Sequence, residues 1–147
     1  MLQLALYEMF LQSKSIKAIA KGADDDKPTK GMASSLAAIT SLKKLCNHPD
    51  LIWELCRDKK EGWEKGLDCY PPGYNPAKSV QPDLSGKMAV LDGILALLKS
   101  TTKDKVVLVS NYTETMDVFE KLCRQRRYSV VQHHSNLYKG FPVKIQR

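Results

Sequence analysis

The sequence has 147 residues, of which 43% are apolar and 27% are charged, and these are the proportions of a globular protein. No run of eighteen apolar residues occurs, and no basic region precedes the apolar start, so neither a membrane-spanning helix nor a signal peptide is indicated. The formal net charge is +7, and the four cysteines form no Cys-x-x-Cys pair, which favours buried, reduced thiols in an intracellular protein.

The first third of the sequence has the periodicity of helices. Apolar residues recur on one face over 2–21, with Gly22 as the stop, and again over 34–46. The second helix is expected to bury Leu36, Ile39, Leu42, Leu45 and Cys46. Three aspartates, a proline and two glycines predict a loop over 22–31. Pro49 ends the second helix and favours a short third one, with Asn47 as its cap.

Residues 57–84 contain three glycines and four prolines, which exclude regular secondary structure over most of this stretch. Trp63, Tyr70 and Tyr74 are spread through it, so parts of it are expected to pack on a surface. A structureless loop of this length is rare within one compact domain. We therefore interpret it as the join between two structural units.

Ser85 is expected to cap a helix that extends to Ser100 with one apolar face. That face comprises Met88, Leu91, Ile94, Leu95 and Leu98. The Gly-Lys pair at 86–87 does not form a phosphate-binding loop, because Gln81 stands where glycine is required and Met88 where serine or threonine is required.

The stretch from Lys105 to Tyr112 carries the strongest strand signal. Four consecutive apolar residues over 106–109 suit a strand buried on both faces of a parallel sheet. A helix with one apolar face is predicted over 113–123, capped by Asn111 or Thr113, and a second strand over 128–131. These elements form a βαβ unit, and a single unit leaves such a sheet incomplete.

Basic residues dominate the last part of the sequence. No acid follows Glu120, and the seven basic residues beyond it equal the net charge: Lys121, Arg124, Arg126, Arg127, Lys139, Lys144 and Arg147. An uncompensated positive field of this kind fits binding to phosphates. The alternative is that these side chains complement the C-terminal end of a helix dipole, and the sequence leaves both open. The pair His133-His134 is interpreted as solvated rather than metal-binding.

Three segments, in this order, resemble the middle of the SWI/SNF-type DNA translocases of helicase superfamily two. They are Leu-Tyr-Glu-Met-Phe-Leu at 6–11, Ser-Leu-Lys-Lys-Leu-Cys-Asn-His-Pro at 41–49, and Ser-Gly-Lys at 85–87 followed by the strand at 105–112. The amino-acid sequences of residues 42–49, 70–74 and 105–113 are most similar to those of the Rad-fifty-four branch of recombination-repair proteins. The resemblance covers about 2–130, and an unexpected sequence follows Val131.

The resemblance implies an α/β fold, in which a helical region is followed by the incomplete start of a RecA-like parallel-sheet lobe. It divides the chain into a helical region after a first ATPase lobe (1–56), an inter-lobe linker (57–84), the start of a second RecA-like lobe (85–132) and a divergent tail (133–147). On this interpretation the ATP-binding and hydrolysis motifs lie outside these residues. The chain alone is therefore expected to be inactive.

The resemblance also implies a function, that of a fragment of a nuclear, ATP-dependent translocase on double-stranded DNA in homologous recombination and DNA repair. Duplex DNA, a RecA-like recombinase filament, ATP and magnesium are implied for the whole protein, and no membrane is. Two alternatives stay open: a chromatin-remodelling ATPase, and a non-catalytic truncated isoform that binds DNA or protein.

The candidate DNA-binding residues come from two sources. Ser110, Asn111 and Tyr112 match a DNA-contacting motif of the family, at the C-terminal end of the predicted strand, where open α/β sheets meet their ligands. Arg124, Arg126 and Arg127 come from the basic run. The sequence indicates no catalytic, cofactor-binding or metal-binding residue.

Overall fold

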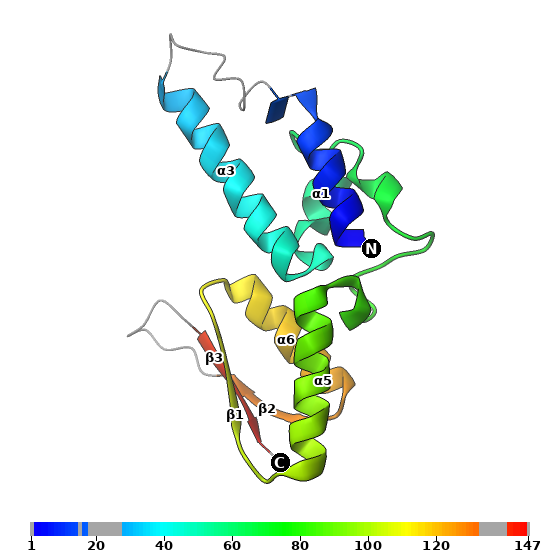
Figure 1. The fold of residues 1–147 in the computed structure, drawn as a ribbon, viewed down its shortest axis with the longest axis vertical. Coiled ribbons are helices and arrows are strands. Elements are labelled where there is room, and N and C mark those ends of the chain that lie inside the picture. The colour runs from blue at the N-terminus through cyan, green and yellow to red at the C-terminus, as the bar shows by residue number, and fades with distance from the viewer. Residues whose placement is uncertain (1, 15, 18–27, 133–140, 147) are drawn as a thin grey trace. The chain divides into compact units, whose positions relative to one another are not determined.

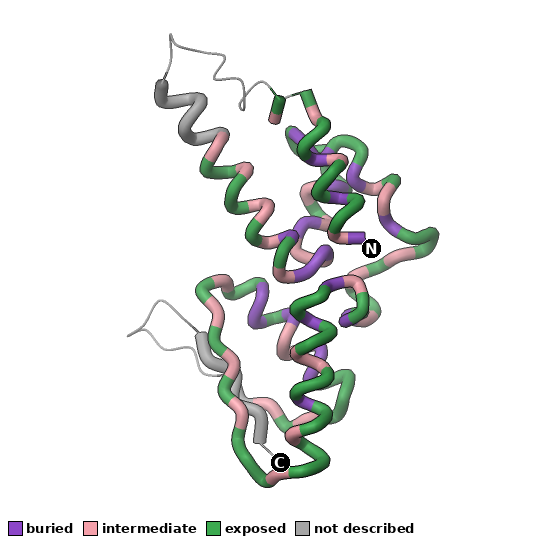
Figure 2. Tube along the Cα trace, in the orientation of Figure 1, coloured by how far each residue is buried: buried purple, intermediate pink, exposed green. Residues whose placement is uncertain are grey.

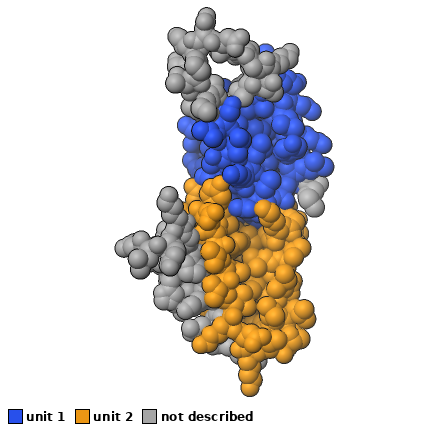
Figure 3. Space-filling view, turned by 60° about the vertical axis from the view of Figure 1, so that its left-hand side comes forward, with its two compact units in different colours: residues 1–74 blue, residues 75–147 orange. Residues whose placement is uncertain are grey.

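The computed structural model describes residues 2–14, 16, 17, 28–132 and 141–146. The chain divides into two compact units, residues 1–74 and 75–147 (Figure 3). The boundary after Tyr74 falls inside the stretch that is rich in proline and glycine. Each unit has buried apolar residues of its own, so each has its own core.

Unit 1 is helical in its described part (Figure 1). Its elements are α1 (Leu2–Gln12), α3 (Pro28–Asn47), the 3-10 helix η1 (Pro49–Ile52), α4 (Trp53–Arg57) and the 3-10 helix η2 (Gly66–Cys69). The first helix ends at Gln12 rather than at Lys21, and residues 18–27, which include the predicted stop at Gly22, lie outside the described residues. The second begins at Pro28, within the predicted loop, because proline suits a first helical turn, whose amides need no intrahelical partner.

Pro49 ends α3 as predicted, but the cap of the next turn differs from the prediction. The cap is His48, which is fully buried and whose Nδ1 accepts a hydrogen bond from the Asp50 amide at 3.2 Å. Asn47, the predicted cap, is instead the last residue of α3. The imidazole of His48 therefore caps this turn in place of the predicted side chain of Asn47.

The core of unit 1 forms where α1 meets the 57–74 stretch. Phe10 and Trp63 are each 1% exposed, and their rings stack with centroids 4.4 Å apart. The backbone at Gly62 has a φ of 84°, and a Cβ there would lie 2.8 Å from Phe10 Cε2, so the chain passes closely over the ring. Packing of the predicted irregular stretch on a surface is thus confirmed.

Over 35–47, the part of α3 whose burial is described, the buried residue lies near the C-terminal end (Figure 2). Leu45 is 2% exposed, and its carbonyl accepts a hydrogen bond from Gln3 Nε2 at 2.7 Å. Leu36 and Ile39, predicted to be buried, are 59% and 49% exposed, and Cys46, predicted to be buried too, is exposed. Periodicity marks the apolar face of a helix correctly, but it does not say how far along that face a neighbour extends.

Unit 2 contains helices and strands. Its elements are the 3-10 helix η3 (Pro82–Leu84), α5 (Gly86–Thr101), β1 (Val106–Ser110), α6 (Thr113–Gln125), β2 (Ser129–Gln132) and β3 (Phe141–Gln146). The Ser85 cap is confirmed, since its Oγ accepts a hydrogen bond from the Met88 amide at 3.3 Å. On the predicted apolar face of α5, Met88 and Leu95 are buried, whereas Ile94 is 48% exposed.

The strand–helix–strand order is confirmed, but the predicted parallel pairing is wrong for the described strands. The sheet order is β1-β3-β2, and β3 is antiparallel to both neighbours. The first two strands therefore run in the same direction without being hydrogen-bonded to each other. The residues that separate them belong to the tail, which shows no strand period in the sequence.

One face of this sheet is covered by α6, and it carries much of the core of unit 2. Met116, Leu122 and Cys123 on α6 are each 0% exposed, as their spacing predicted. On β1 the exposure alternates, and Val107 and Val109 are 49% and 66% exposed. The prediction of a strand buried on both faces is therefore wrong within the described part of the chain.

Candidate nucleic-acid interface

The six predicted DNA-binding residues lie at opposite ends of α6 (Figure 1). Ser110 to Tyr112 connect the end of β1 to the start of α6, whereas Arg124 to Arg127 lie at its far end. The helix has 13 residues, so at a rise of 1.5 Å per residue the two groups are separated by about 20 Å. The structure therefore does not bring them together in one site.

The end of β1 forms a short hydrogen-bonded turn. Ser110 Oγ accepts a hydrogen bond from the Tyr112 amide at 3.1 Å, and Asn111 is exposed. Tyr112 is the N-cap of α6 and makes no side-chain capping bond, so the predicted cap at Asn111 or Thr113 is wrong. The Ser110 hydroxyl still has its proton to donate, and the Asn111 amide is accessible, so this turn offers neutral donors to a phosphate.

One feature of the strand end works against anion binding. The first turn of α6 carries Glu114, whose negative charge complements the positive end of the helix dipole. The same charge repels a phosphate that approaches this helix N-terminus. Contact with DNA at this end therefore depends on the hydroxyl and amide groups rather than on charge.

At the far end of α6, two of the three arginines have carboxylate partners. Arg126 Nε lies 2.9 Å from Asp92 Oδ1 and its Nη2 lies 2.5 Å from Oδ2, and this hydrogen-bonded carboxylate raises the pKa of the guanidinium. Arg124 Nη2 lies 2.6 Å from Glu120 Oε1. The prediction that both residues lie in an uncompensated positive field is therefore wrong, because their acidic partners stand earlier in the sequence.

Arg127 differs from these two in backbone and in partners. Its φ is 57°, and the bonds Tyr128 N to Cys123 O (2.8 Å) and Arg127 N to Arg124 O (3.0 Å) form a Schellman motif that ends α6. Its exposed guanidinium makes no ion pair with any described residue. Lys99 Nζ donates to the Arg127 carbonyl at 3.3 Å and lies 4.4 Å from the centroid of the Tyr128 ring.

The sequence interpretation missed the basic residues that precede β1. Lys99, Lys103 and Lys105 stand within seven positions and are accompanied there by a single acid, Asp104. This local excess was visible in the sequence. A count of basic residues that begins after Glu120 does not include it.

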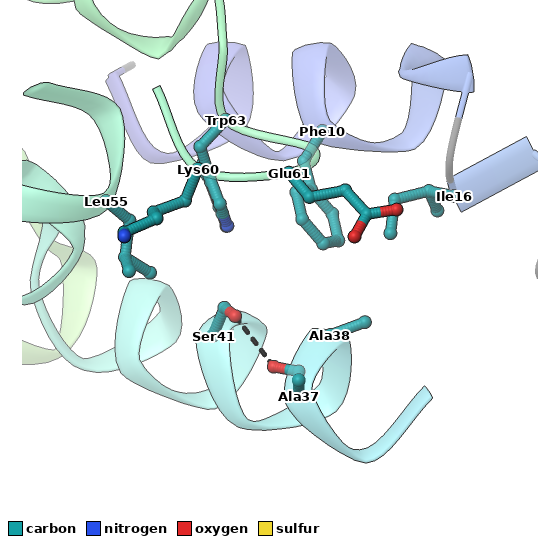
Figure 4. Close-up of a pocket in the computed structure, with 9 residues that line it drawn as sticks. All are labelled: Phe10, Ile16, Ala37, Ala38, Ser41, Leu55, Lys60, Glu61 and Trp63. Atoms are coloured by element: carbon teal, nitrogen blue, oxygen red, sulfur yellow. Dashed lines mark hydrogen bonds between the residues drawn. The ribbon is translucent and has the colours of Figure 1, made fainter. Parts of the chain in front are cut away.

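Unit 1 contains a pocket of about 300 Å³ between α1, α3 and the loop at 60–63 (Figure 4). Phe10, Trp63 and Ile16 supply apolar walls. Ser41 lines it too, but its hydroxyl already donates to the Ala37 carbonyl at 2.7 Å. The charged side chains of Lys60 and Glu61 also line it, but they point in opposite directions (Figure 4), so they do not converge on a small ligand.

Neither a metal-binding cluster nor a membrane-spanning helix is found in the described part of the chain. No group of three or more His, Cys, Asp or Glu side chains among the described residues is placed to hold a metal ion. No described helix has the length and the apolar character required to cross a membrane. The pair His133-His134 lies outside the described residues.

Comparisons with known proteins point to one group of relatives. No family model matches the sequence. The chain is 56% identical over 131 residues to a protein of Gallus gallus named "DNA repair and recombination protein RAD54-like", 54% over 132 residues to that of Danio rerio, and 53% over 131 residues to that of Homo sapiens. Each alignment covers 89% of this chain but 17% of the relative, so the chain spans about a sixth of the length of these relatives.

Proposed function

We propose that this chain is a fragment of an ATP-dependent translocase that acts on double-stranded DNA in homologous recombination. The chain is homologous to a short region of the RAD54-like DNA repair and recombination proteins. The observation that carries the proposal is the identity of 53–56% over 89% of the chain. On this proposal unit 2 is the start of a RecA-like lobe, and the protein works in the nucleus with duplex DNA and a recombinase filament.

The contribution proposed for these residues is DNA binding rather than catalysis. The 147 residues contain no phosphate-binding loop, so ATP and magnesium are proposed for the whole protein and not for this chain. The turn at Ser110 and Asn111 supports the proposal because it offers neutral donors at the C-terminal end of a strand. Phosphate contacts of this kind do not read sequence, so different duplexes are expected to bind alike.

Titration of the purified chain with two unrelated labelled duplexes, at several salt concentrations, tests this proposal. We expect non-specific dissociation constants on the order of 10⁻⁴ to 10⁻⁶ M at physiological salt, and log affinity that falls linearly with log salt. The variant Ser110→Ala/Asn111→Ala should bind both duplexes more weakly.

The matched control is Ser100→Ala/Thr101→Ala, which removes two hydroxyls from exposed residues at the end of α5 and should bind as the parent does. Absence of DNA binding by the parent chain would contradict the proposal. ATP hydrolysis by the chain alone, with or without DNA, would contradict the assignment of catalysis to other residues. The two alternatives, a chromatin-remodelling ATPase and a non-catalytic binding module, stay predictions.

A further inference from the structure

We propose that unit 2 carries a second phosphate-binding surface, formed by Lys103, Lys105 and Arg127 at the end opposite to the turn at Ser110. We call it the strand-start surface. Its ligand is the phosphate backbone of duplex DNA, and in this respect it rests on the proposed function. It replaces the arginine cluster that the sequence indicated, of which only Arg127 remains.

Two connections place these residues at one end of the sheet. Lys105 directly precedes β1, and Arg127 lies in the turn that precedes β2. Val106 and Val130 both pair with Ile145 of β3, so the two strands begin at the same end of the sheet. Basic residues that are 22 positions apart in the sequence therefore flank the same end of unit 2.

The position of these residues is fixed by local contacts. Lys99 Nζ joins α5 to the turn after α6, through its bond of 3.3 Å to the Arg127 carbonyl and its contact with the Tyr128 ring. On the other connection, Thr102 Oγ1 accepts a hydrogen bond from the Asp104 amide at 3.2 Å. The charged ends thus project from two ordered turns.

The charge on this surface is largely uncompensated. Lys103, Lys105 and Arg127 are all exposed, and none of them makes an ion pair within the described residues. The acid in this group of residues is Asp104. Arg124 and Arg126, by contrast, are held by carboxylates, so they add little positive potential. Exposed, unpaired cations are the groups that release counterions when they meet phosphates.

The backbone conformation at Arg127 does not require an arginine side chain. The left-handed residue of a Schellman motif is usually glycine, which adopts a positive φ without strain. The fold thus has no use for a side chain at this position. Arginine here places a charge at the outer edge of the turn, next to the start of β2.

Unit 1 offers a matched control for this substitution. Lys59 has a φ of 50°, and the bonds Lys60 N to Leu55 O (2.9 Å) and Lys59 N to Cys56 O (3.2 Å) form a second Schellman motif, at the end of α4. The variants Arg127→Gly and Lys59→Gly therefore remove the same charge from the same backbone geometry, and only the first belongs to the strand-start surface.

The decisive experiment measures the salt dependence of DNA binding by the full chain. Arg127→Gly should keep or raise the melting temperature and reduce the slope of log affinity against log salt by about one unit. Lys103→Ala/Lys105→Ala/Arg127→Gly should reduce it by about two to three units. Arg127→Lys, which keeps the charge, should preserve the slope. Lys59→Gly/Lys60→Ala/Lys65→Ala, with the same loss of charge in unit 1, should also leave it unchanged.

The outcomes separate the two proposals. If the parent chain binds DNA but the triple variant keeps the parental slope, the strand-start surface is refuted and the proposed function stands. If the parent does not bind DNA, the proposed function itself fails, and this inference fails with it. A triple variant that loses binding to poly-glutamate but keeps its DNA slope would assign the surface to an acidic protein partner and overturn the choice of DNA.

Discussion

The guanidinium of Arg126 is held by both carboxylate oxygens of Asp92, at 2.9 Å and 2.5 Å, and this pair joins the end of α6 to the middle of α5. The Asp92 side chain is 18% exposed and that of Arg126 is 48% exposed, so the pair lies at the border between solvent and the core of unit 2. The two-point geometry fixes the angle at which α6 ends. Arg126 is therefore a residue that supports the fold.

Replacing Arg126 by alanine should lower the stability of unit 2 without changing the salt dependence of DNA binding. We expect the free energy of unfolding to fall by about 0.5–1 kcal/mol, the range of partly exposed ion pairs with good geometry. Asp92→Ala should have a similar effect, and the double variant should lose less than the sum of the two single losses. Urea unfolding gives the energies, and DNA titration gives the slope. If Arg126→Ala reduced the slope of log affinity against log salt by a full unit, Arg126 would belong to the DNA-binding surface.

Gly66 leaves no room for a side chain. A Cβ at this position would lie 2.3 Å from Cys56 Sγ and 2.9 Å from Cys56 Cβ, and Cys56 is fully buried. Gly66→Ala should therefore destabilise unit 1 by about 1–3 kcal/mol, as overpacking does. Thermal or urea unfolding measures the loss. In a Cys56→Ala background the additional loss should be smaller, because the nearest atom is gone.

A matched glycine supplies the control for that experiment. Gly93 lies within α5, and nothing lies within 4 Å of the position that its Cβ would take. Gly93→Ala should stabilise the chain by about 0.5–1 kcal/mol, since alanine loses less backbone entropy in a helix. Equal destabilisation by the two substitutions would show that contact with Cys56 is not the cause.

A partly buried hydrogen bond in unit 1 gives a third prediction. The Tyr74 hydroxyl donates to Asp50 Oδ1, and the side chain of Asp50 is 8% exposed. Tyr74→Phe removes a bond to a charged group, so it should destabilise unit 1 by about 1.5–3 kcal/mol. Tyr7→Phe, at a residue that is 42% exposed, should stay within about 0.5 kcal/mol in the same unfolding measurement. Equal effects of the two substitutions would argue against a structural role of the Asp50 contact.

Local features of the fold could be predicted from the sequence. The Ser85 cap depends on residues three positions apart, and the buried face of α6 depends on one helical period, so both are encoded within a short window. The turn at Ser110 was located for the same reason, at the end of a run of β-branched residues. Its cap was misassigned because several adjacent polar residues could each have supplied it.

Features that depend on distant residues could not be predicted. The partner of Arg126 stands 34 positions earlier, and nothing near Arg126 identifies it. The position of β3 between β1 and β2 depends on a tail without a strand period. The separation of the two groups of candidate residues could not be read from the sequence either, because charge counted along the chain does not show that they lie at opposite ends of one helix.

The buried thiols predict a loss of stability at alkaline pH. Burial raises the pKa of Cys56 to about 12 and that of Cys123 to about 11, from the ordinary thiol value of 9.0. Burial also raises the pKa of the Tyr70 and Tyr74 hydroxyls. In the unfolded chain these thiols release their protons near pH 9, whereas in the folded chain they retain them. The stabilisation is thus fully present below pH 9 and is lost as pH rises through 11 and 12.

Urea unfolding at a series of pH values tests this linkage. The midpoint should be nearly constant from pH 7 to 8 and should fall progressively above pH 9, because the unfolded state then binds fewer protons than the folded state. Cys123→Ala should make this fall shallower, although its lost packing lowers stability at every pH. Cys46→Ala, which removes an exposed thiol, is the control for the loss of one thiol without lost packing. A fall that keeps its steepness in Cys123→Ala would mean that other groups account for the alkaline sensitivity, because only a group that titrates differently in the two states can change the slope.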